Sequence, residues 1–170
     1  MKTKWHFCAL LGLPFLIFLQ ATPAFAWETY VGKSMTCRVI SVTQGNTLTV
    51  KNDSGKELAL SFYGIGIPTE RQPFGNEAHK LLLSILPPGE KCIVTTVNST
   101  DEGLISALVQ VQDRSVNNRL VSEGLGWVDR FTCKAFFCRR WHIEEHIAQK
   151  ERRGVWSINV RTPPWQWGER

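Results

Sequence analysis

Apolar and polar residues follow two different periods along this chain. Alternation with a period of two is typical of strands that bury one face, and it predicts strands over residues 37–42, 47–50, 57–65, 91–97 and 105–112. Apolar residues three and four positions apart predict helices over residues 76–86, 115–123 and 141–152, with Asn76 as the cap of the first. Three strands, a helix, two strands and then helices is the element order of a five-stranded OB-type Greek-key barrel. The predicted fold class is therefore α+β, mainly a β-barrel, with a helix between strands three and four and with C-terminal helices.

The first 26 residues have the pattern of a cleavable secretory signal peptide. A short basic start precedes an apolar run over residues 7–19, and residues 24–26 form a small-x-small cleavage site. The apolar run is shorter than the ~20 residues that a membrane span needs. We therefore expect a secreted or periplasmic protein whose residues 27–170 form one domain without a transmembrane segment.

Composition and charge leave several classes of partner open. The chain is 43% hydrophobic and 21% charged, which is typical of a folded protein and excludes a disordered one. The formal net charge of +5 falls to +3 when the two lysines of the signal are removed. A mildly basic domain of this kind permits contact with nucleic acid or with an anionic envelope surface but requires neither.

Four cysteines follow the signal: Cys37, Cys92, Cys133 and Cys138. An even number in an exported chain suggests two disulfides, for which three pairings exist. Cys133 and Cys138 enclose only four residues, so a local bridge is the simplest choice, and Cys37 would then pair with Cys92. Because the first and fourth strands of the barrel are neighbours, that second bridge would close it. A zinc site at the C-x4-C spacing is the competing interpretation, although no histidine flanks it at zinc-finger spacing.

Two further patterns have both a chemical and a structural interpretation. His142 and His146 belong to an H-x-x-E-H sequence, the inverted zinc-protease signature, but no distal glutamate ligand is evident and an ordinary helix explains the segment. The mature tryptophans could stack bases or sugars. Core packing is favoured for Trp127, Trp141 and Trp156, whereas Trp165 and Trp167 lie in a proline-rich tail that either is exposed or packs back on the barrel.

Short motifs in a fixed order point to a known family. They cover residues 42–48 (VTQGNTL), 63–68 (YGIGIP), 72–78 (QPFGNEA), 116–128, 138–148, 154–156 (GVW) and 163–165 (PPW). In order and spacing this set resembles the staphylococcal nuclease-like (thermonuclease) family over nearly the whole mature length. The resemblance implies an OB-type fold and hydrolysis of DNA and RNA with one calcium ion. It also implies two aspartates and a carbonyl that hold the ion, a glutamate that helps to activate water, and two arginines that clamp the phosphate.

The sequence departs from that pattern at each side-chain position that the resemblance assigns to chemistry. The two carboxylates of the family's first turn are replaced by the amides Gln44 and Asn46, and its second metal aspartate by Gly66. The arginines are replaced by Ser61 and Leu104, and the glutamate by Thr69. Losing an arginine that stabilises a transferring phosphoryl group costs ~10³–10⁵ in rate. Loss of general-base help costs a further ~10²–10⁴. We therefore expect no catalytic residues and no resident metal, and a neutral cleft bordered by Asn46, Thr47, Ser61 and Thr69.

Three functions follow from this interpretation. The first is an exported pseudoenzyme that binds or scaffolds a protein, a nucleic acid or an envelope polymer. The second is a divergent calcium-dependent phosphodiesterase in which Glu70 and Arg71 replace lost groups. The third is a single-strand nucleic-acid binder that does not cut.

Overall fold

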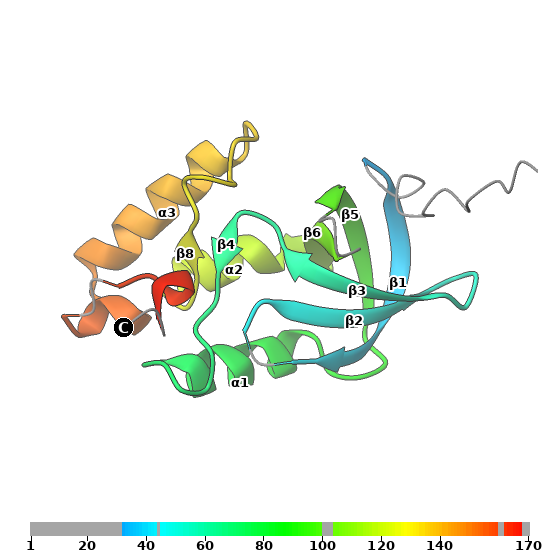
Figure 1. Cartoon of the computed structure of the whole chain (residues 1–170), viewed down its shortest axis with the longest axis horizontal. Helices are drawn as coiled ribbons and strands as arrows, with labels where there is room; N and C mark the ends of the chain where they lie inside the picture. Colours follow the sequence, from blue (N-terminus) through cyan, green and yellow to red (C-terminus); the bar gives the residue numbers. More distant parts are fainter. Residues whose placement is uncertain (1–31, 44, 100–103, 160–161, 168–170) are drawn as a thin grey trace, which may run out of the picture.

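Five strands close into a barrel in the computed structural model, which describes residues 32–43, 45–99, 104–159 and 162–167 (Figure 1). The barrel strands are β1 (Ser34–Val42), β2 (Thr47–Asn52), β3 (Glu57–Phe62), β5 (Lys91–Ser99) and β6 (Ile105–Val111). They pair antiparallel in the order β3-β2-β1-β5-β6, and a parallel pairing of β3 with β6 completes the closure. The predicted OB-type fold is confirmed, and so is the contact between the first and fourth barrel strands, β1 and β5. The predicted signal peptide lies outside the described residues.

The barrel closes because alternate residues of each strand point to its interior. In β2 and β3 the inward positions carry Leu48, Val50, Leu58, Leu60 and Phe62, all 5% exposed or less. Burying a side chain of this size contributes about 1.5–3 kcal/mol. The period of two in the sequence therefore predicts both the strands and the face that each strand buries.

Three helices and several short elements surround the described part of the barrel. They are α1 (Gly75–Ile85), α2 (Val116–Ser122), α3 (Cys138–Lys150), the 3₁₀ turns η2 (Gly154–Ser157) and η3 (Pro164–Gln166), and the two-residue strands β4 (Ile65–Gly66), β7 (Arg114–Ser115) and β8 (Trp127–Val128). Figure 1 shows α1 along the lower side of the barrel and α3 at the end away from the β2–β3 hairpin. No helix in the described part of the chain combines the length and the apolar character needed to cross a bilayer.

The third predicted strand, 57–65, is divided in the structure. Gly64 has φ +68°, a left-handed conformation that favours glycine. A Cβ at Gly64 would also lie 2.5 Å from Cys133 Sγ, so no side chain fits there. The chain turns at this glycine, and β4 leaves the barrel to pair with β8.

The first and last helices begin at other residues than the sequence predicts. Phe74, with φ 65°, is the N-cap of α1 in place of Asn76, and no side chain caps this end. Gly75 follows because a Cβ there would overlap the carbonyl oxygen of Thr69. α3 begins at Cys138, three residues earlier than predicted, because a turn in which Cys138 N–H donates to Ala135 O leads directly into the helix.

One of the two predicted disulfides is formed. Cys133 and Cys138 are bonded, with their Cα atoms 5.7 Å apart. This local bridge links the start of α3 to the segment after β8. The zinc alternative at this spacing is wrong, because the two sulfur atoms are bonded to each other.

The Cys37–Cys92 disulfide that the sequence suggested is not formed. The two residues are register partners in β1 and β5, and both are buried free thiols. In an antiparallel ladder, hydrogen-bonded pairs recur every two residues. Val39 bonds to Glu90 and Thr96 bonds to Lys33, and both pairs lie an even number of residues from Cys37 and Cys92. The two cysteines therefore form a hydrogen-bonded pair. Cβ atoms at such positions are about 5.5 Å apart, wider than the ~3.8 Å that a disulfide requires. The sequence correctly predicted that the first and fourth barrel strands are neighbours. The register of these strands holds the two cysteines too far apart to bond, so both remain free thiols.

Candidate functional site

Several positions that the resemblance assigns to chemistry meet at one end of the barrel. Thr47 at the start of β2 is the register partner of Ser61 near the end of β3. The turn before β2 contacts the loop before α1, since a Cβ at Gly45 would lie 3.1 Å from Thr69 Cγ2. Asn46, Ser61 and Thr69 therefore belong to one neighbourhood, as predicted. Gln44 lies outside the described residues.

The side chain of Asn46 is used to join two strands. Its Oδ1 accepts a hydrogen bond from Phe62 N at 3.2 Å, and its Nδ2 donates to Phe62 O at 3.4 Å. The same residue's carbonyl oxygen also accepts from Phe62 N, at 3.3 Å. This amide therefore fixes the end of β3 next to Ser61, and it presents no negative charge to a cation.

Gly66 lies beneath an indole ring. A Cβ built at Gly66 would be 2.6 Å from Cε3 and 2.8 Å from Cζ3 of Trp165. Gln72 holds the tail in this position: its Nε2 donates to Pro164 O at 2.8 Å, while its Oε1 accepts from Thr69 N at 2.9 Å. Figure 1 shows the same arrangement, with the red turn η3 beside β4 and β8. The position to which the resemblance assigns a second metal aspartate is thus a glycine whose side-chain space is filled by the C-terminal tail.

The remaining assigned positions give no charged cluster. Leu104, partly buried, directly precedes Ile105, which pairs with Leu60 at the edge of this neighbourhood. Glu70 and Arg71 lie with Thr69 on the exposed side of the loop before α1. Among the described residues no group of three His, Cys, Asp or Glu side chains is arranged to hold a metal. Calcium needs several hard anionic oxygens, and the glycine and amide found here do not fit it.

Glu145, the central acid of the H-x-x-E-H sequence, points into the protein. It is 4% exposed, its Oε1 accepts from Val128 N at 2.8 Å, and its Oε2 lies 3.5 Å from Arg130 Nη2. Burial raises the pKa of this carboxyl group, and the Val128 N–H, Arg130 and His142 oppose the rise. Glu145 therefore attaches α3 to β8, and His146 on the same helix is exposed. The segment has the structural role that the sequence favoured.

An aromatic cavity that the sequence did not predict lies next to Trp165. It has a volume of about 460 Å³, and its lining includes Trp127, Trp156, Trp165 and Phe131. The rings of Trp127 and Trp156 are 4.3 Å apart. These two residues are half-buried and not part of the core, whereas Trp141 is buried as predicted. Strand alternation contains no information about this cavity, because its walls come from four separate segments.

We compared the chain with models of protein families and with known proteins. The family model described as "Staphylococcal nuclease homologue" matches residues 43–158. An "Uncharacterized endonuclease" of Escherichia coli is 25% identical over 160 residues, which are 93% of this chain and 97% of the relative. A "Micrococcal nuclease" of Shigella flexneri is 24% identical over 162 residues, covering 89% of this chain and 87% of the relative. "Staphylococcal-like nuclease CAN1" of Arabidopsis thaliana is 26% identical over 113 residues, 66% of this chain and 33% of the relative.

Proposed function

Since the chain belongs to the staphylococcal nuclease family, we propose that it is an exported member that no longer hydrolyses phosphodiester bonds and acts as a binding or scaffold module. Its fold is that of the family, so the proposal concerns only the chemistry at one end of the barrel.

The contact between Trp165 and Gly66 is the observation that carries this proposal. A nuclease of this family needs a carboxylate at position 66 to bind its calcium ion, and an aspartate there would overlap the indole ring. The neighbouring Asn46, Ser61 and Thr69 are uncharged. Without fixed charges, neither an ion nor the developing charge on a phosphoryl group is stabilised.

The alternative is a divergent calcium-dependent phosphodiesterase. The names of the relatives favour it, since several are called nucleases or endonucleases. Its chemistry would depend on Glu70 and Arg71, which lie on an exposed loop beside the site. This alternative has to explain how one carboxylate in water would hold an ion that the family holds with two aspartates.

Export is supported by two separate features. The first 26 residues have the signal-peptide pattern, and the Cys133–Cys138 disulfide is compatible with an oxidising compartment outside the cytoplasm. The proposed location is therefore secreted or periplasmic.

Incubation with nucleic acid tests the loss of hydrolysis. Purified protein is mixed with single-stranded DNA, duplex DNA or RNA, with calcium or with a chelator, and the products are separated by size. We expect no cleavage that the chelator removes. Chelator-sensitive cleavage that is lost in Glu70→Gln but kept in Glu77→Gln, a matched acid on α1, would establish the alternative instead.

The binding role is tested in the same preparation. A mobility shift of uncut single-stranded DNA that weakens between about 50 mM and 200 mM salt identifies a nucleic-acid binder. If no shift occurs, crosslinking in the exporting cell followed by mass spectrometry identifies a protein or polymer partner. Failure to recover any partner, together with cleavage, would contradict the binding role.

A further inference from the structure

The segment from the end of β8 to the first residue of α3, residues 129–138, is held firmly at its base. We call it the disulfide loop. The Cys133–Cys138 bond closes it. The Tyr63 hydroxyl group lies within it, donating to Thr132 O at 2.9 Å and accepting from Lys134 N at 3.2 Å. These contacts tie the loop to the end of β3.

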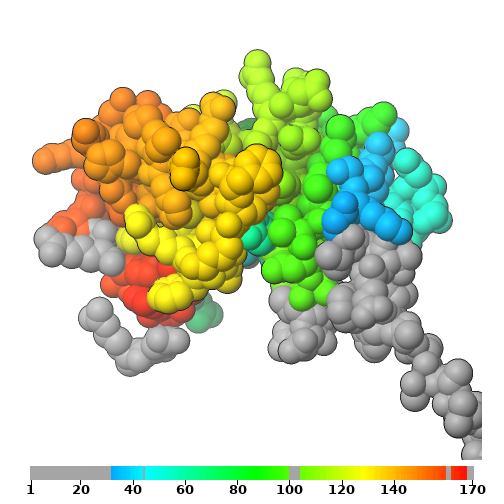
Figure 2. All heavy atoms as spheres, turned by 90° about the horizontal axis from the view of Figure 1, so that it is seen from above, coloured from blue at the N-terminus to red at the C-terminus, as the bar shows by residue number. Residues whose placement is uncertain are grey.

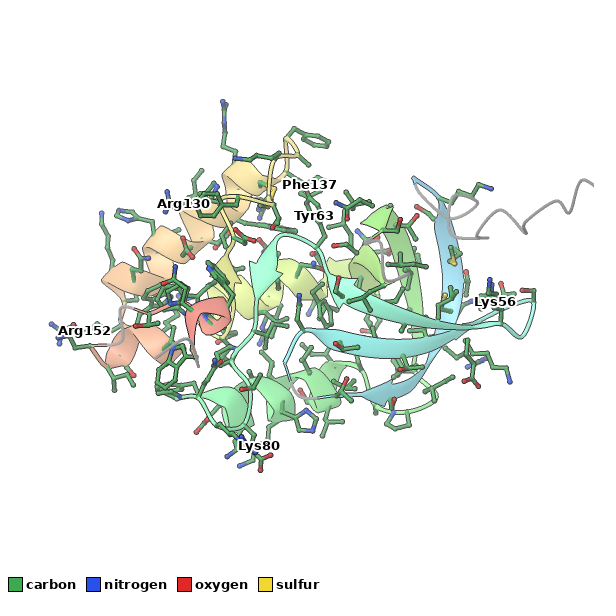
Figure 3. The ribbon with its side chains drawn as sticks, in the orientation of Figure 1. Lys56, Tyr63, Lys80, Arg130, Phe137 and Arg152 are labelled. Carbon is green, nitrogen blue, oxygen red and sulfur yellow. A yellow bond between two sulfur atoms is a disulfide. The ribbon has the colours of Figure 1, made fainter. Side chains whose placement is uncertain are left out.

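Aromatic packing by Phe137 and hydrogen bonds to the Asp129 carboxylate also hold the disulfide loop in place. Phe137 packs edge-on against Tyr63 with ring centroids 5.8 Å apart, and both labels lie at the base of the loop in Figure 3. Asp129 accepts from Phe131 N at 2.8 Å and from Thr132 Oγ1 at 2.7 Å. The backbone of the loop is therefore ordered before any partner arrives, which lowers the entropic cost of binding.

Two phenylalanines on this fixed loop point into solvent. Phe131 is 84% exposed and Phe136 is 91% exposed, the two highest values among the exposed large apolar residues of the described chain. Figure 2 shows the yellow segment that contains them on the face toward the viewer, beside α3. Apolar surface presented in this way is typical of an interaction site.

Basic side chains surround the two rings. Arg130, Lys134, Arg139 and Arg140 lie on or next to the loop, and the nearby carboxylates are Asp129, Glu144 and Glu145. All four cations are exposed. Within the described part of the chain, Lys134 and Arg139 form no ion pair, while Arg130 is 3.5 Å from Glu145 and Arg140 is 3.7 Å from Glu144. The excess positive charge beside the phenylalanines therefore comes from Lys134 and Arg139, which no carboxylate in the described part of the chain pairs.

We propose that the disulfide loop binds the surface of a lipid bilayer that contains anionic phospholipids. Phe131 and Phe136 enter the boundary between headgroups and acyl chains, and the four cations contact the anionic headgroups. Apolar rings combined with nearby basic residues are the two attachments that a peripheral membrane protein requires. A single nucleic-acid strand fits less well: Phe131 also lines the aromatic cavity, where a base could stack, but Phe136 is not part of that lining and is 91% exposed.

Vesicle sedimentation tests the proposal with purified residues 27–170, because the apolar run of the first 26 residues would itself partition into vesicles. We expect binding to vesicles of phosphatidylethanolamine and phosphatidylglycerol, weak binding to pure phosphatidylcholine, and release by high salt. Phe131→Ser together with Phe136→Ser should reduce the partition coefficient by about tenfold or more. Lys134→Glu or Arg139→Glu should each reduce it by about fivefold or more.

Matched variants elsewhere on the surface serve as controls. Ile158→Ser removes another exposed apolar side chain, 45% exposed, and Lys80→Glu reverses a charge on α1, far from the loop in Figure 3. Both should bind vesicles as the parent does. Equal binding by the double phenylalanine variant and the parent, or no binding to anionic vesicles, would overturn the proposal. So would a loss of single-stranded DNA binding in that variant without any effect on vesicles, which would assign the loop to nucleic acid. All of these outcomes can be read whether or not the protein hydrolyses phosphodiester bonds.

Discussion

Position 66 combines an expected loss of charge with an observed contact. The resemblance assigns a metal-binding aspartate to this position, and the glycine found there leaves room for the Trp165 ring. Restoring the carboxylate would therefore not restore the ion site, because the tail has to move first. The resemblance read from the sequence predicts neutral residues at positions that include Asn46 and Gly66. It could not reveal the indole, because the two contacting residues are almost one hundred positions apart.

Gly66→Ala tests this contact in isolation. The added Cβ would lie 2.6 Å from Trp165 Cε3, so we expect the free energy of unfolding to fall by about 1–3 kcal/mol. In a Trp165→Ala background the same substitution should cost almost nothing, because the overlapping ring is gone. Urea unfolding of the four proteins gives the coupling. Additive effects would show that the indole does not rest on Gly66 in solution.

Among the elements, the disulfide loop depends most on a covalent bond. The bond joins Cys133 in the loop to Cys138, the residue at which α3 begins. Cross-linking residues so close in sequence removes a modest amount of entropy from the unfolded chain.

Replacing both cysteines of this bond by serine should lower the free energy of unfolding by about 2 kcal/mol. The barrel should persist, because the bond joins residues outside its strands, which are held by their own ladder of hydrogen bonds. Denaturant unfolding measures the loss, and circular dichroism of the folded variant checks the barrel. A much larger loss would mean that the bond also holds α3 against the barrel.

The elements that the sequence predicted are those whose periodicity reflects one buried face. β2 and β3 alternate between the core and solvent from Leu48 to Phe62, and their pattern was sufficient. The predicted element boundaries are wrong where contacts between residues far apart in the sequence determine them. The break at Gly64 is fixed by Cys133, and the cap at Phe74 is fixed by the close approach of Gly75 to Thr69. The neutral character of the site could be predicted residue by residue, whereas the tail that covers it could not.

At the scale of the whole molecule, the barrel contains two thiols that cannot ionise easily. Burial, then the nearby Asp53, raises the pKa of Cys37 to about 11. Burial, then Cys37 and Glu90, raises the pKa of Cys92 to about 12. In the unfolded chain both thiols titrate near their ordinary value of 9.0. Above that pH the unfolded state loses protons that the folded state retains, so alkali destabilises the barrel.

We therefore expect stability to be unaffected by these thiols below pH 9 and to fall as the pH rises from about 9 to 11, with each thiol contributing at most ~1.4 kcal/mol per pH unit. The reference is a variant with Cys37→Ala and Cys92→Ala, since lysines and tyrosines titrate equally in both proteins. The difference between the two free energies of unfolding should shrink steadily over this window. A constant difference would contradict the free thiols. Mass mapping without reductant would then show whether oxidation has joined β1 to β5 despite the hydrogen-bonded register, because a disulfide has no proton to lose.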